Sequence, residues 1–178
     1  MVIRKNTACG FSMLELLSVM ALIGILAILA APSAKTYLAS INLRTATSAI
    51  KQQLILARTK AMGNPNVHCG VYFNTSVTPN TSQPFLDTNA NYLYDSTAHP
   101  DPMYMPVYKM PRNVTINVGG TGTDKVMVFR GDGSAKTGNP GITNNQIIVT
   151  VTVTGKSGLL TRSKTISVLP STGRIKVQ

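Results

Sequence analysis

The sequence predicts an α+β fold in which one long N-terminal helix packs on a mainly antiparallel β domain. Residues 11–31 are almost wholly apolar, and residues 32–62 continue with apolar positions spaced by three and four, which is typical of a helix. From residue 66 the apolar residues recur at every second position, the period of a strand. Segments rich in Gly, Asn, Asp and Pro separate these stretches. One helix followed by several short strands indicates an α+β domain.

The apolar run at residues 11–31 contains Glu15 as its only ionisable residue. Its length matches the roughly 20 residues that cross a bilayer core as a helix. A basic leader, residues 1–10, precedes it and ends in Gly10. In an ordinary export signal the cleavage site follows the apolar run, whereas here the small residue comes first. Cleavage after Gly10 would leave the helix on the mature protein, and the basic leader predicts that this end faces the cytoplasm.

Glu15 is the only glutamate in the chain. A charged residue at mid-bilayer costs about 2.5–3.5 kcal/mol on insertion scales, so it marks a function and a partner. The expected partner is a positively charged amine. The alternative is a carboxylate near the membrane edge that reaches water, and the sequence favours pairing.

The stretch Gly-Phe-Ser-Met-Leu-Glu-Leu-Leu at residues 10–17 resembles the class III signal of type IV pilins and of the pseudopilins of type II secretion. The resemblance implies that a prepilin peptidase cleaves between Gly10 and Phe11 and methylates the new amino terminus at Phe11. It also implies that Glu15 pairs with the amino terminus of Phe11 in a neighbouring subunit. Other pilin subunits, an inner-membrane assembly platform and membrane lipid are the further partners that it implies.

The sequence predicts four parts: a leader at 1–10, a transmembrane or filament-core helix at 11–31, an amphipathic continuation at 32–62 and a periplasmic β domain at 63–178. Pro32 predicts an interruption of the helix because proline removes a backbone hydrogen bond. Gly63, followed by Asn64 and Pro65, predicts its end. The predicted buried face of the continuation is Leu43, Ala46, Ile50, Leu54, Ala57 and Ala61.

Three cations recur every seven residues on another face of this helix, at Arg44, Lys51 and Arg58. A solvated face is favoured over a dedicated binding stripe. In the β domain, residues 74–102 are polar and predict a long loop or insertion. Strands are expected at 67–73, 103–109, 114–118, 126–129, 147–154, 159–169 and 174–177, with turns at 119–124, 130–133, 155–158 and 170–173.

Oxygen-bearing side chains alternate at Asp87, Asn89 and Asn91, with Asp95 beyond them, a spacing that resembles a calcium loop. An EF-hand loop would have Gly in place of Tyr92 and Glu where Ala98 stands. The sequence therefore favours a polar turn, and no metal or other cofactor is expected.

The C-terminal tail is strongly basic. The chain has a net charge of +11, which becomes +9 once the leader and its Arg4 and Lys5 are removed, and no acid follows Asp132. The candidate phosphate-binding residues are Arg162, Lys164, Arg174 and Lys176. The alternative, equally weighted, is an edge hairpin whose cations prevent pairing with other strands.

The whole chain resembles the minor pseudopilin H and FimT/FimU minor pilin group. FimT proteins of transformable bacteria use a terminal G-R-x-R motif to bind DNA, and this chain has Gly173-Arg174-Ile175-Lys176. Lysine keeps the charge but not the bidentate fork of arginine. The resemblance implies a minor subunit of a secretion pseudopilus or a pilus, anchored by one pass in a bacterial inner membrane and placed near the filament tip, with DNA uptake as the alternative function.

No catalytic constellation is visible, so an enzyme is not expected. His68 and His99 have no nucleophile in a recognisable local motif. Cys9 lies in the leader, which leaves Cys69 without an intramolecular disulfide partner, and its apolar neighbours predict a small buried side chain.

Overall fold

The computed structural model describes residues 11–96, 100–119, 124–136, 147–154 and 161–178. Within these ranges the side chains of residues 29–35, 124, 147–149, 151, 153 and 154 are not described. The predicted leader, the turn at 155–158 and most of the turn at 119–124 lie outside the described residues.

Helix α1 runs from Met13 to Gly63. Ser12 begins it, because its Oγ and carbonyl oxygen both accept a hydrogen bond from the N–H of Glu15. Ser12 followed three residues later by Glu15 is the sequence of a capping box, in which a side chain satisfies an N–H that the helix leaves unpaired. Near the end, the N–H of Asn64 donates to the carbonyl of Ala61, and the predicted end at Gly63 is confirmed.

The helix does not end at Pro32, since α1 is assigned without a gap through this position. The expected interruption is therefore not a break in the helix. A proline removes only one backbone donor, and the turns on either side keep their own hydrogen bonds.

The chain divides into two compact units, Met1–Tyr37 and Leu38–Gln178. The second half of α1 thus belongs to the same unit as the strands. The predicted boundaries at 31/32 and 62/63 followed the change in hydropathy and the end of the helix, whereas the compact unit begins where the helix starts to bury side chains.

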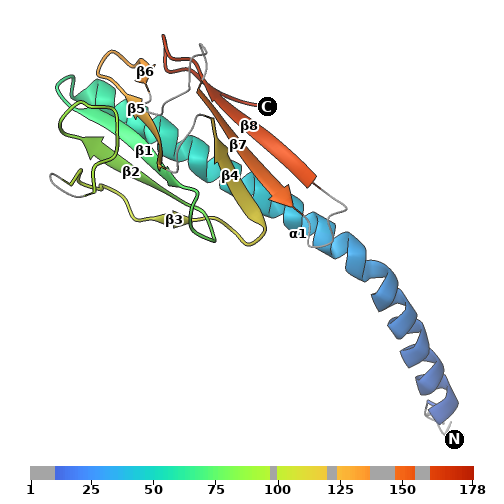
Figure 1. The fold of residues 1–178 in the computed structure, drawn as a ribbon. Coiled ribbons are helices and arrows are strands. Elements are labelled where there is room, and N and C mark those ends of the chain that lie inside the picture. The colour runs from blue at the N-terminus through green and yellow to red at the C-terminus, as the bar shows by residue number, and fades with distance from the viewer. Residues whose placement is uncertain (1–10, 97–99, 120–123, 137–146, 155–160) are drawn as a thin grey trace, which may run out of the picture. The chain divides into compact units, whose positions relative to one another are not determined.

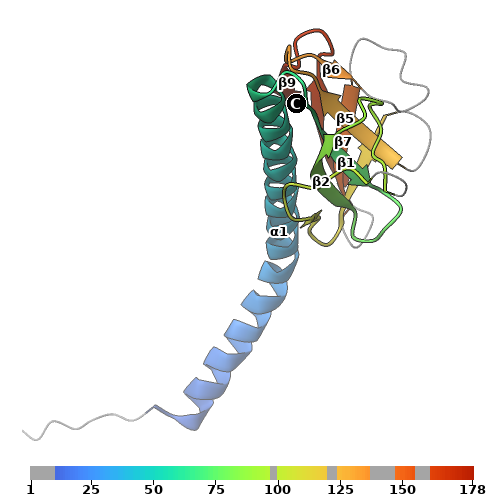
Figure 2. The same ribbon diagram turned by 90° about the vertical axis from the view of Figure 1, so that its left-hand side faces the viewer.

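Two antiparallel sheets pack beside the second half of α1 (Figures 1 and 2). The first has the order β3-β2-β1-β5-β6 and the second β4-β7-β8-β9. Every strand pairing within the described ranges is antiparallel, which confirms the α+β class. The strands are β1 His68–Asn74, β2 Thr81–Asp87, β3 Tyr108–Lys109, β4 Val114–Val118, β5 Asp124–Phe129, β6 Ala135–Lys136, β7 Ile147–Thr154, β8 Thr161–Val168 and β9 Ile175–Val177.

The predicted loop at residues 74–102 is wrong in part, because it contains β2, which pairs along its whole length with β1. Pro84 and the polar residues around it are typical of a loop, so the sequence did not predict this strand. A proline is tolerated there because β3 pairs with β2 only at Thr81 and Ser82, so no ladder hydrogen bond to β3 is needed at Pro84. The strand predicted at 103–109 is correspondingly reduced to β3 and an isolated bridge between Met103 and Phe85.

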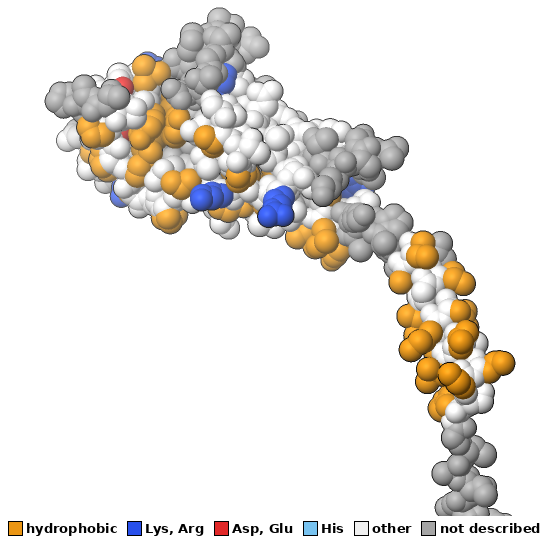
Figure 3. Space-filling model, turned by 60° about the horizontal axis from the view of Figure 1, so that its bottom comes forward, with side chains coloured by type: hydrophobic (Ala, Val, Ile, Leu, Met, Phe, Trp, Pro, Cys, Tyr) orange, Lys and Arg blue, Asp and Glu red, His pale blue; other side chains and the backbone are white. Residues whose placement is uncertain are grey.

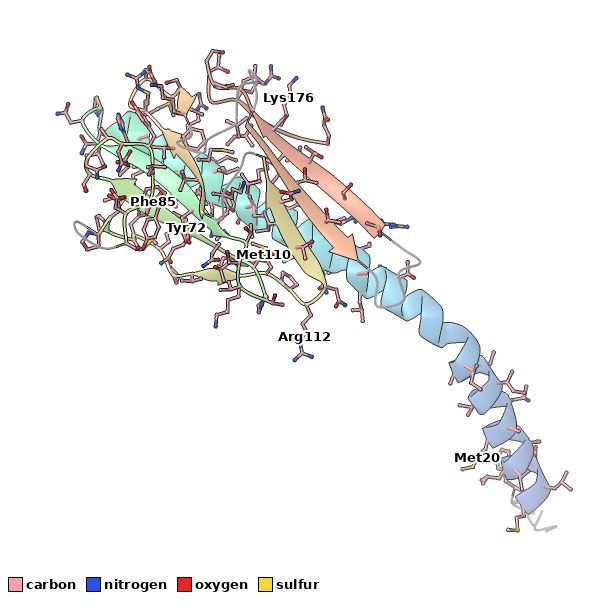
Figure 4. All side chains as sticks on the ribbon, in the orientation of Figure 1. Met20, Tyr72, Phe85, Met110, Arg112 and Lys176 are labelled. Atoms are coloured by element: carbon pink, nitrogen blue, oxygen red, sulfur yellow. The ribbon has the colours of Figure 1, made fainter. Side chains whose placement is uncertain are left out.

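The core lies between α1 and both sheets. All six predicted helix positions are buried, with Leu43 at 5% exposure and the others at 0%. They join one cluster with apolar side chains of β1, β4, β5 and β8. A smaller cluster lies on the opposite face of the first sheet, where Tyr72 and Phe85 lie close together under the segment that follows β2 (Figure 4).

Gly173 is expected to tolerate no side chain. It has a φ of +60°, and an added Cβ would overlap the carbonyl oxygen of Gly133 and lie 3.0 Å from Nε of Arg58. Gly173→Ala should therefore lower the free energy of unfolding by more than about 1 kcal/mol, measured by chemical denaturation. The matched control is Gly63→Ala, where nothing lies within 4 Å of the added Cβ. Equal stability of the two variants would contradict the clash.

Candidate functional site

The first half of α1 exposes apolar side chains on all sides. Every residue from 11 to 28 is exposed, with Phe11 at 79% and Leu14 at 81%. Figure 3 shows these hydrophobic side chains projecting from the helix over the face in view. A helix that is apolar all round is normally buried in a membrane or among other helices. This segment is therefore built for contacts outside its own chain.

Glu15 is the single charge on this surface. It lies in the first turn of α1, where a carboxylate interacts favourably with the positive end of the helix dipole. Its carbonyl oxygen accepts a hydrogen bond from Oγ of Ser18 at 2.8 Å. No ion pair to its carboxylate is present among the described residues. Glu15 itself is exposed.

The capping role of Ser12 was not predicted from the sequence. The signal was present, since Ser or Thr three residues before Glu and ahead of an apolar run is the pattern of a capping box. The cap is made by the Ser12 side chain and the backbone N–H of Glu15, so experiments on the Glu15 carboxylate must control for the start of the helix.

Comparison with known proteins identifies this segment. Residues 5–31 match the prokaryotic N-terminal methylation motif. A motif of this kind indicates a type IV pilin-like or pseudopilin subunit. It supports prepilin cleavage and N-methylation, and it implies association with prepilin peptidase and other pilins. No curated protein and no solved structure matches the chain.

Among the described residues, no helix is long and apolar enough to cross a membrane. The span at 11–31 stays a prediction, as do cleavage between Gly10 and Phe11 and methylation at Phe11.

The four basic residues of the tail do not share one face. In the register of β8 with β9, Lys176 lies opposite Ser167, whereas Ile175 and Val177 lie opposite Val168 and Ile166. By the alternation of side chains, Arg162 and Lys164 fall on the same face as Ile166, and Lys176 falls on the other. Lys164 is also about 10 Å along the strand from the level of Lys176. Only Arg174 and Lys176 remain as a pair, and both are exposed.

A groove of about 680 Å³ lies between α1 and the tail, lined in part by Ile55, Arg58, Leu169 and Arg174. Arg58 is held there by two contacts. Its Nη2 donates to the carbonyl of Thr172 at 3.0 Å, and its Nε donates to the carbonyl of Gly133 at 3.4 Å. Arg58 therefore joins α1 to two turns and is not part of a solvated face, whereas Arg44 and Lys51 are exposed as expected.

Cys69 packs as predicted, with an exposure of 0%. Burial raises the pKa of its thiol to about 11, against the lowering effect of Lys60, so the thiol is protonated at neutral pH and is not a nucleophile. Among the described residues, no group of three or more His, Cys, Asp and Glu side chains is placed to hold a metal ion.

Arg58→Ala should lower the free energy of unfolding by about 1–2 kcal/mol, because it leaves two turn carbonyls without a charged donor. The measurement is chemical denaturation of the full chain in detergent micelles. Lys51→Ala is the control, since Lys51 is an exposed cation of the same helix, and its effect should stay within about 0.5 kcal/mol. Similar losses in both variants would show that Arg58 contributes only charge.

Proposed function

We propose that this protein is a minor pilin or pseudopilin, a structural and assembly subunit of a type II secretion pseudopilus or a type IV pilus, without catalytic activity of its own. The observation that carries the proposal is the wholly exposed apolar surface of residues 11–28, with Glu15 as its single charge, inside the matched methylation motif.

The physical argument starts from the two environments that such a helix needs. Before assembly the apolar surface requires lipid, which supports a single-pass inner-membrane protein with its β domain in the periplasm. In a filament the same surface packs against the corresponding helices of neighbours. Glu15 then leaves lipid head groups for an apolar surrounding, where it needs a positive partner.

The amino terminus of Phe11 fits this need. Cleavage after Gly10 creates an amine four residues from Glu15 in sequence, and no Lys or Arg lies between residues 11 and 31. An amine supplied by a neighbouring subunit would neutralise Glu15 and fix how far one helix is displaced along the next. A position near the filament tip, together with an assembly platform as partner, completes the proposal.

Glu15→Ala should abolish incorporation into filaments while leaving cleavage intact, because the carboxylate is the proposed partner of a neighbour's amine. The amount in sheared filaments is measured by immunoblotting. Mass spectrometry of the membrane fraction confirms a chain that begins at a methylated Phe11.

Glu15→Asp and Glu15→Gln are the matched controls for this test. Asp keeps the charge on a shorter side chain and should restore part of the incorporation, whereas Gln keeps the capping-box geometry without charge and should not. Normal incorporation of Glu15→Gln would sink the pairing role. Failure to detect the methylated Phe11 in the wild type would count against the whole proposal.

DNA binding in natural transformation is the second candidate function. It is favoured by Arg174 and Lys176, which are exposed at adjacent positions of one face, with Arg174 lining the groove that also contains Arg58. Such cations suit phosphates rather than bases. Arg162 and Lys164 lie on the other face and are not part of this reduced site.

The double variant Arg174→Ala/Lys176→Ala should weaken DNA binding by the full chain and reduce the slope of log affinity against log salt by about 1–2. Binding is measured by fluorescence anisotropy at several salt concentrations. The control is Lys109→Ala/Arg112→Ala, which removes the same charge from exposed positions elsewhere; Figure 4 shows Arg112 well apart from Lys176. Equal losses in both would indicate nonspecific attraction to a basic protein.

A further inference from the structure

The groove near the end of α1 combines apolar walls with positive charge. It has a volume of about 680 Å³ and lies between Ile55 and Arg58 of the helix and Leu169, Arg174 and Ile175 of the tail. Figure 2 shows β9 beside this end of α1. Ile55 is 45% exposed although it is wholly apolar. The hydrogen bonds of Arg58 to the two turns explain one edge of this groove but not its open apolar side.

β9 borders the groove as an edge strand of the second sheet, with β8 as its one partner among the described strands. Thr165 of β8 and Gln178 exchange both backbone hydrogen bonds, at 3.0 and 2.9 Å. The backbone groups of successive residues point to opposite sides of a strand, so those of Ile175 and Val177 point away from β8. A row of unpaired N–H and C=O groups is a template for a further strand.

The two arginines at the groove have no acidic partner. In the part of the chain that the structure describes, both ion pairs belong to other residues. Arg58 is half-buried, and its Nε and Nη2 donate to turn carbonyls, which fixes the plane of its guanidinium. Its Nη1 has no acceptor among the described residues. A fixed guanidinium with free N–H groups matches the geometry of a carboxylate.

A second copy of this chain is a poor source of that carboxylate. The chain has 6 acidic residues against 17 Lys and Arg. Asp87 and Asp101 are buried, at 2% and 3% exposure. The carboxylate of Asp132 accepts hydrogen bonds from the N–H and Oγ of Ser134 and lies 4.0 Å from Arg130. Charge complementarity therefore favours a partner of different sequence with exposed acidic residues.

We propose that an extended acidic segment of another protein binds in this groove and adds to the second sheet as a strand beside β9. Its backbone pairs with the open edge of β9, its carboxylates pair with Arg58 and Arg174, and an apolar side chain covers Ile55. In strand addition the main-chain hydrogen bonds give affinity and the side chains select the partner. The groove is separate from residues 11–28, so this contact holds or fails independently of the proposed pairing of Glu15.

The same arginines attract nucleic acid, but the groove favours a peptide. Ile55, Leu169 and Ile175 give it apolar walls, which suit side chains of a peptide and not phosphates. Lys176 is exposed and does not line the groove. Removal of Lys176 therefore separates the two classes of partner, because it affects phosphate contacts and not a peptide in the groove.

The test is binding of a fluorescently labelled peptide of alternating Asp and Val residues to the full chain in a non-ionic detergent, followed by fluorescence anisotropy. Saturable binding is expected. Ile55→Glu should weaken it about tenfold or more, because the new carboxylate repels the peptide and competes for Arg58, three residues along the helix. Leu56→Glu is the matched control and should leave binding unchanged, since Leu56 is 42% exposed but does not line the groove.

Hydrogen exchange of the wild type tests the strand addition without any variant. Bound peptide should slow exchange at the N–H groups of Ile175 and Val177, which face the open edge. The N–H of Lys176 is the internal control, since Lys176 already lies opposite Ser167 of β8 and should change little.

Charge and class of partner are tested with two further probes. A peptide with Lys in place of Asp should not bind. Lys176→Ala should leave binding of the acidic peptide unchanged while it weakens binding of a DNA oligonucleotide. Equal binding of the two peptides, equal losses in the two Glu variants, or unchanged exchange at Ile175 and Val177 would overturn the proposal. Loss of DNA binding in Ile55→Glu, with no binding of the acidic peptide by the wild type, would assign the groove to nucleic acid instead.

Discussion

The compact unit depends on the burial of one stripe of α1 against both sheets. Ala46, Ala57 and Ala61 allow the strands to approach the helix closely, while Ile50 and Leu54 fill the space between them. Strands that are far apart in sequence meet on this stripe, because β1, β4, β5 and β8 all contribute to the same cluster. Buried polar contacts then fix the alignment, as where Oγ of Ser82 donates to Oε1 of Gln53 at 2.7 Å. Without the helix each sheet would expose an apolar face.

Two turns close the end of this unit, and α1 reaches both through Arg58. The turn before β6 presents the carbonyl of Gly133, and the turn before β9 presents that of Thr172. Gly173 fits between them only because it has no side chain. The same contacts place Arg174 beside Arg58 at the groove. The position of the basic tail therefore follows from the hydrogen bonds that Arg58 makes to the two turns. This was not indicated by the composition of the tail or by the seven-residue spacing of Arg44, Lys51 and Arg58.

The periodicity of apolar residues predicted the elements whose position depends on local sequence. It did not predict the features that depend on pairing between strands. The helix stripe, β4 and β7 were predicted at their observed positions because their apolar spacing is regular. β2 was missed because Pro84 and its polar neighbours resemble a loop, and only its pairing with β1 makes it a strand. For the same reason the placement of the two basic pairs relative to each other could not be predicted, since the register that separates Arg162 from Lys176 follows from the β8–β9 pairing. Burial of Asp87 and the positive φ of Tyr92 were not predicted, because both are set by tertiary structure.

In the proposed function, the first half of α1 and the β domain have different roles. The first half offers neighbours an apolar surface with one charge, and apolar surfaces alone specify register poorly, because a helix can slide or rotate along another at little cost. One buried carboxylate removes that freedom, since every register that leaves it without an amine carries the penalty of an unpaired charge. The apolar surface and its single charge both lie within the matched methylation motif, so the proposed pairing would align a subunit without distinguishing it from others that carry the motif. The identity of this subunit must then reside in the β domain, where the groove beside Arg58 and the acidic loop at Asp87 are its individual features.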